Sequence, residues 1–237
     1  MDPLAASRSS LHRVAVHICA RARVAQSGRF SLRVTPGGFG TPDLGSYGRR
    51  VRVSGAHLIV EADTMDEPWA RSTAIDGRSL ADLATFAGVD LSEDLDVGHD
   101  TPPVGDVNEP IALDTAAAAE INEWFGVVAV ILDRVLGEMP DRADETLPRL
   151  WPEHFDVAVE AQAHPARRVN LGGSPGDSFS EEPYLYVGPW TSDRPGDEGF
   201  WNAPFGAAVT RRDLMADGAD PVAAGVAFLL DGFNRLR

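Results

Sequence analysis

The sequence predicts an α+β protein in which mainly antiparallel strands surround a long buried central helix. Two sets of short β-prone runs and one strongly apolar helical stripe support this fold class. The order of helix, about four strands and helix occurs twice along the chain. This order leaves two arrangements open: two similar halves, 1–110 and 111–237, or one continuous sheet with helices on a single face.

Residues 11–26 fit two patterns. Alternate apolar residues are typical of a strand, whereas Leu11, Val14 and Ile18 also lie on one helical stripe. Ser9 and Ser10 precede the segment and Gly28 follows it, and these residue types cap helices. The caps favour a helix.

The predicted strands fall into two groups with turn-forming residues between their members. The first group is expected at 30–35, 50–54, 57–62 and 70–75. The second group is expected at 154–161, 167–171, 184–187 and 205–210. Ser54-Gly55-Ala56 predicts a hairpin turn.

Three further helices are predicted from apolar stripes with capping residues at their ends: 80–87, 115–136 and 221–236. The helix over 115–136 is apolar on most sides, which predicts a central position. Their caps are Ser79 and Gly88, Asp114 and Gly137, and Asp220 followed by Pro221. Residues 89–111 are acidic and proline-rich and predict a surface loop, and residues 138–148 predict a linker.

Composition narrows the classes of function. The net charge is −15, and all 21 basic residues are Arg, scattered along the chain, so nucleic-acid binding is not expected. The apolar run Trp124–Leu132 is too short for the roughly 18 residues that cross a bilayer, so no membrane association is expected. Cys19, the single cysteine, cannot form an internal disulfide, and its apolar neighbours predict a buried, inert thiol. The sequence therefore predicts a cytoplasmic protein.

Two predicted strands and the segment between them carry the candidate site. Period-2 alternation on 154–161 separates an apolar face, which includes Phe155, from a polar face with His154 and Asp156. Tyr184 and Tyr186 likewise share one face of a later strand. The residues expected at this surface are His154, Asp156, Asn170, Ser174, Asp177, Tyr184, Tyr186, Trp190, Trp201 and Asn202.

This surface has three interpretations. Aromatic area with a few orienting polar groups favours a small-molecule cleft, in a binding or interaction protein. His154 and Asp156, with Asp177 as a third ligand, would instead hold a divalent metal for a hydrolase. The third interpretation is an ordinary solvated sheet face. We expect the cleft, with the hydrolase as the alternative.

Seven short segments occur in an order that resembles an uncharacterised bacterial family, a conserved domain of unknown function common in actinobacteria. They are Leu11-His12, Val34-Thr35-Pro36-Gly37-Gly38, Arg78–Leu83, Trp151 with Phe155–Val159, Glu182–Tyr186, the aromatic turn after it, and Asp220-Pro221. The resemblance covers almost the whole chain and implies an α+β fold. It implies no catalytic residue.

Overall fold

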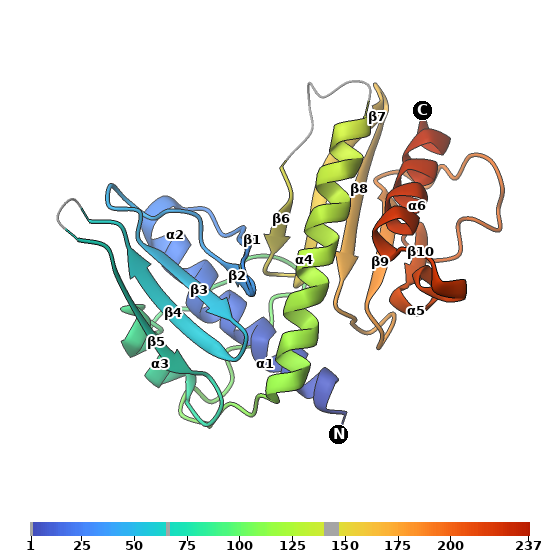
Figure 1. The fold of residues 1–237 in the computed structure, drawn as a ribbon. Coiled ribbons are helices and arrows are strands. Elements are labelled where there is room, and N and C mark those ends of the chain that lie inside the picture. Colours follow the sequence, from blue (N-terminus) through green and yellow to red (C-terminus); the bar gives the residue numbers. More distant parts are fainter. Residues whose placement is uncertain (1, 65–66, 140–146) are drawn as a thin grey trace. The chain divides into compact units, whose positions relative to one another are not determined.

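The computed structural model describes residues 2–64, 67–139 and 147–237, and it confirms the α+β class. The chain forms two compact units (Figure 1). Unit 1 comprises residues 1–126 and 150–155, and unit 2 comprises 127–149 and 156–237. The units are interleaved in the sequence, unlike the contiguous halves considered above.

Unit 1 begins with a long helical segment, which confirms the helical interpretation. It consists of α1 (Pro3–Val14), the π-helical η1 (Ala15–Ala20) and α2 (Arg21–Ser27). The segment starts earlier than predicted because the Asp2 carboxylate accepts the Leu4 N–H at 3.2 Å. It ends at Gly28, whose φ of 67° is a left-handed conformation that glycine adopts readily. Every residue of η1 is buried, which explains why its sequence also resembled a strand.

The sheet of unit 1 has strands in the sequential order β1-β2-β3-β4-β5, all antiparallel. They are β1 (Arg33–Thr35), β2 (Gly38–Gly40), β3 (Arg50–Ser54), β4 (His57–Ala62) and β5 (Trp69–Ala74). The bounds of β3 and β4 are those predicted. The strand predicted over 30–35 begins only at Arg33 and ends at Thr35 as expected. Pro36 and Gly37 then turn the chain into β2, which the sequence did not predict.

Helix α3 (Leu80–Ala87) follows the sheet. Its N-cap is Ser79 and its C-cap is Gly88, which confirms the prediction. The Ser79 side chain accepts the Asp82 N–H at 3.1 Å, and the Asp82 carboxylate accepts the Ser79 N–H at the same distance. This reciprocal pair is a capping box. The chain then forms the acidic loop that leads to α4.

Helix α4 (Thr115–Glu138) begins in unit 1 and ends in unit 2. The Asp114 carboxylate caps it by accepting the Ala117 N–H at 2.8 Å. By length and composition α4 could cross a membrane, with a mean hydropathy of 1.4 in its most apolar window. Half of that window is buried inside the protein, and the core helix of a soluble protein has the same composition. Residues 140–146 of the predicted linker lie outside the described residues.

The second sheet has the order β10-β9-β8-β7-β6, and its described pairings are antiparallel. Its strands are β6 (Arg149–Trp151), β7 (Asp156–His164), β8 (Arg167–Ser174), β9 (Tyr184–Pro189) and β10 (Ala207–Thr210). The sequence did not predict β6. Short helices α5 (Arg211–Leu214) and η2 (Ala216–Gly218) lead to α6 (Pro221–Leu236), which starts at the predicted Asp220 cap.

One face of the β8–β9 region is apolar and packs on α6 and the second half of α4 (Figure 1). Two glycines of α6 allow its backbone to approach β9 closely. A Cβ atom at Gly232 would lie 2.5 Å from Val187, and one at Gly225 would lie 2.8 Å from Leu185. The opposite face of the same strands carries the polar and aromatic residues.

Cys19 lies in η1 and is fully buried. Burial raises the pKa of its thiol to about 12. Because the thiolate is the nucleophilic form, this thiol is inert at neutral pH. The structure thus agrees with the buried environment predicted from its neighbours.

Candidate functional site

Three basic side chains of the N-terminal helical segment bind the acidic loop of residues 90–106 by its main chain. Arg13, His17 and Arg21 are spaced by four residues, so they follow one side of the helix. Their bonds run from Arg13 Nη2 to Val104 O (2.7 Å), His17 Nε2 to Pro102 O (2.9 Å) and Arg21 Nη1 to Glu93 O (2.7 Å). The loop is therefore held by its carbonyl groups, and its carboxylates take no part in these bonds.

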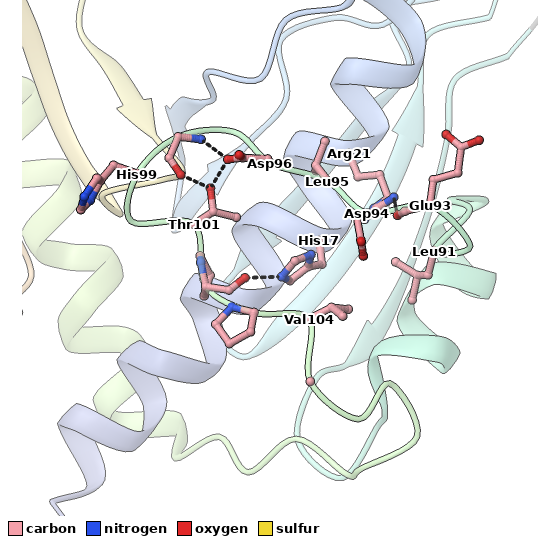
Figure 2. A pocket seen from close by; sticks show the side chains of 14 residues that line it. His17, Arg21, Leu91, Glu93, Asp94, Leu95, Asp96, His99, Thr101 and Val104 are labelled. Atoms are coloured by element: carbon pink, nitrogen blue, oxygen red, sulfur yellow. Dashed lines mark hydrogen bonds between the residues drawn. The ribbon is translucent and has the colours of Figure 1, made fainter.

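A pocket of about 450 Å³ lies between this helical segment and the loop (Figure 2). This volume is within the usual range of small-molecule sites, roughly 300–1,000 Å³. Its lining combines charged and apolar groups. The apolar part consists of Leu91, Leu95, Pro102, Pro103 and Val104, and the polar part includes His17, Arg21, Glu93, Asp94, Asp96, His99 and Thr101.

His17 is 2% exposed and lies in the π-helical segment, a helix type often found at functional sites. Its Nε2 must donate to the Pro102 carbonyl, which can only accept. Burial lowers the pKa of the imidazole, and the charges of Arg21 and Arg13 lower it further against the opposing effect of the Pro102 bond. The ring is therefore neutral at pH 7. Its buried Nδ1 is an acceptor that makes no hydrogen bond with the described residues.

Arg21 is 9% exposed and supplies the positive charge of the pocket. Its Nη1 donates to the carbonyls of Asp90 and Glu93, at 3.3 and 2.7 Å. Its Nε is buried without a hydrogen bond among the described residues. The guanidinium is thus positioned by the loop and keeps donor capacity.

The acidic side chains of the loop have different roles. The Asp96 carboxylate accepts the Gly98 N–H at 3.0 Å and the Thr101 hydroxyl at 3.4 Å, so it stabilises the loop itself. In Figure 2 the Asp94 carboxylate points toward the space between Arg21 and His17, whereas the Glu93 carboxylate points away. Asp94 is therefore the loop carboxylate best placed to meet a ligand.

The sequence alone did not predict this pocket. Its residues lie about 70–90 positions apart, between the helical segment and the loop, so no local motif joins them. The available signal was the spacing of Arg13, His17 and Arg21 along one side of the helix. The acidity of 89–111 was no guide, because the loop is bound through main-chain carbonyl groups, which every residue carries.

Acidification is expected to lower the free energy of unfolding, in part through His17. Because its folded pKa lies below 6.5, the unfolded chain binds the proton more tightly. The contribution of the neutral His17 to the free energy of unfolding is complete above the pKa that this histidine has in the unfolded chain. It falls as the pH drops below that pKa, by at most about 1.4 kcal/mol per pH unit for one proton. Urea denaturation at pH 7.5 and 5.5 measures the free energy of unfolding at each pH. Between these pH values it should fall less for His17→Asn than for the parent protein. Equal falls would contradict this role.

The structure gathers five of the ten residues of the candidate surface predicted from the sequence on one face of the second sheet. Asp156 of β7, Asn170 and Ser174 of β8, and Tyr184 and Tyr186 of β9 share that face, as their register requires. The centre of the face is closed by aromatic contacts. These are Tyr184 with Tyr186 at 6.3 Å, and Phe205 with both rings at 6.3 and 6.1 Å.

The two tyrosines of this face are hydrogen-bonded to its carboxylates. Tyr186 donates a short hydrogen bond to Asp156, and Tyr184 donates to Asp177 at 2.6 Å. Burial, followed by the charge of Asp156, raises the pKa of Tyr186. Gly172 makes room for this ring, since a Cβ there would lie 2.7 Å from the Tyr186 hydroxyl. Both tyrosine hydroxyls of this face therefore have a carboxylate partner within it.

The remaining predicted residues have separate partners. Trp190 is 58% exposed, and its indole N–H donates to Asn170 at 3.0 Å. The indole N–H of Trp201 donates to the Pro195 carbonyl at 3.0 Å. The Asn202 amide forms two hydrogen bonds with the main chain of Ala208, at 2.8 and 3.0 Å, which holds the start of β10.

The expectation that His154 and Asp156 share one strand face is wrong. β7 begins at Asp156, because Phe155 has a φ of 54° and turns the chain before the strand. His154 is exposed and its Nδ1 lies 2.9 Å from Asp100, whereas Asp156 accepts from Tyr186. Among the described residues, no group of three or more His, Cys, Asp or Glu side chains could hold a metal.

Fold and pocket together define an α+β protein with two antiparallel meander sheets and a polar pocket under an acidic loop. Comparison with protein-family models found no match, and neither did comparison with curated proteins or with solved structures. The resemblance to an actinobacterial family stays a prediction.

Proposed function

We propose that this protein is a cytoplasmic small-molecule-binding protein whose ligand lies in the pocket between the N-terminal helical segment and the acidic loop of residues 90–106. The observation that carries the proposal is His17 on the pocket lining, 2% exposed, with a buried acceptor that no described residue satisfies. Buried polar groups are normally hydrogen-bonded, and exceptions need an explanation. The single, buried Cys19 supports a reducing compartment.

The polar face of the second sheet is a less suitable place for a ligand than the pocket in unit 1. Its tyrosine hydroxyls are already bonded to Asp156 and Asp177, so a ligand there would have to compete with internal partners. The pocket in unit 1 is lined by His17 and Arg21, whose buried Nδ1 and Nε atoms make no hydrogen bond with the described residues.

Filling the pocket is expected to abolish ligand binding. Val104 lines the pocket, and Val104→Trp adds a large ring there, while Val130→Trp places the same ring on the exposed side of α4. Native mass spectrometry of the full chain, purified gently from the cells that produce it, should show a small-molecule adduct with the parent and Val130→Trp. The adduct should be missing from Val104→Trp.

A second measurement covers ligands that are lost on purification. The imidazole NMR signals of His17 are followed during titration with a panel of small amines, carboxylates and amino acids, for the same three proteins. If no adduct appears and no compound shifts His17, or if both tryptophan variants behave alike, the proposed function is wrong.

A further inference from the structure

We propose that the pocket takes a small zwitterion, a molecule that carries an ammonium group and a carboxylate joined by a short apolar segment. This inference rests on the proposed function and names the ligand class of the same site. It follows from the placement of one carboxylate, one guanidinium and an apolar wall around the same cavity.

The ammonium group is matched by Asp94. Its carboxylate points into the pocket in Figure 2 and makes no hydrogen bond or ion pair with the described residues. Asp96 is occupied by Gly98 and Thr101, and the Glu93 carboxylate points away.

The carboxylate is matched by Arg21. Only Nη1 of this guanidinium is bonded to the loop, and Nε and Nη2 make no hydrogen bond with the described residues. Arginine binds carboxylates through parallel N–H groups, and such charge-assisted bonds are about twice as strong as neutral ones. His17 beside it is neutral, so it adds no second positive charge that would favour a dianion.

The wall between the charged groups is apolar. Leu91, Leu95 and Val104 line the cavity together with Pro102 and Pro103. An alkyl segment is stabilised there by about 25 cal/mol per Å² of apolar surface removed from water. Neither a simple amine nor a simple carboxylate would use both charged groups and this wall together.

The test uses matched probes of three lengths on the full chain. β-Alanine, 4-aminobutyrate and 6-aminohexanoate are each compared with the amine and the carboxylate of the same carbon chain. Isothermal titration calorimetry gives the Kd, and the His17 imidazole signals report where the probe binds. We expect the best zwitterion to bind at least 10-fold more tightly than both of its matched probes.

Two neighbouring charge-removing variants provide the control. Asp94→Asn should weaken the best zwitterion about 10- to 100-fold, as expected for a lost charge-assisted bond. Glu93→Gln removes the same charge from the adjacent residue, whose carboxylate points away, and should change the Kd less than threefold.

The outcomes separate the two proposals. If an amine or a carboxylate shifts His17 and binds as tightly as the zwitterion, or if both variants weaken binding equally, the ligand class is wrong and the pocket remains a binding site. If none of the nine probes shifts His17, the zwitterion proposal is overturned. The proposed function is then decided by native mass spectrometry, through the presence of a small-molecule adduct on the parent protein and its loss in Val104→Trp.

Discussion

Replacing Phe155 by Ala is expected to lower the free energy of unfolding by about 3–5 kcal/mol, the usual cost of removing a large buried ring. Phe155 is 2% exposed and lies at the centre of an aromatic cluster in unit 1. Its ring meets Phe39 and Phe125 edge to face at 5.5 and 5.1 Å, and stacks on His12 at 5.2 Å. Each such pair adds about 0.5–1.5 kcal/mol beyond the buried area.

A second substitution at this position separates backbone strain from packing. Among the described residues, Phe155 is the only non-glycine residue with a positive φ, 54°. Glycine adopts this conformation without the Cβ penalty of about 1–2 kcal/mol. Phe155→Gly should therefore be at least as stable as Phe155→Ala, the reverse of the usual order.

Urea denaturation followed by tryptophan fluorescence measures both variants. Phe179→Ala, at a residue that is 44% exposed, is the control and should cost clearly less. A loss below about 1 kcal/mol for Phe155→Ala would show that the cluster does not stabilise unit 1. A glycine variant less stable than the alanine variant would contradict the strained backbone.

Replacing Tyr186 by Phe is expected to lower the free energy of unfolding by about 1.5–3 kcal/mol, the range for hydrogen bonds to charged groups. The substitution removes only the hydroxyl that donates to Asp156, a residue that is 5% exposed. The Asp156 carboxylate then loses a donor in a place that water does not reach freely, while the ring itself stays packed over Gly172.

The chain has three tyrosines, and Tyr47 provides the matched control. Tyr47 is 59% exposed, so Tyr47→Phe should change stability by less than about 0.5 kcal/mol. Denaturation of both variants at pH 7 makes the comparison. Equal effects at the two positions would show that the short bond to Asp156 contributes nothing to stability.

The parts of the fold that the sequence predicted well are those with local causes. The Ser79 capping box and the Asp220 cap with Pro221 depend on residues within four positions, and their helices start where expected. Alternation along β9 likewise predicted that Tyr184 and Tyr186 share a face, because strand geometry has period 2.

The missed features depend on tertiary contacts. Phe155 carries no local signal for a left-handed turn, yet the aromatic cluster holds it there, and this turn moved His154 off the strand. The pocket needed the pairing of His17 with Pro102, 85 residues away. A sequence taken alone does not show which distant loop a buried histidine will bind.

The interleaved units have a consequence for how this chain folds as it is synthesised. The last residues of unit 1, 150–155, emerge from the ribosome only after the second half of α4, which belongs to unit 2. Unit 1 therefore cannot complete its core until Phe155 has been translated, although its sheet and helices are made much earlier. Folding on the ribosome must wait for this short segment, and a fragment cut at residue 126 would lack the ring on which its aromatic cluster closes.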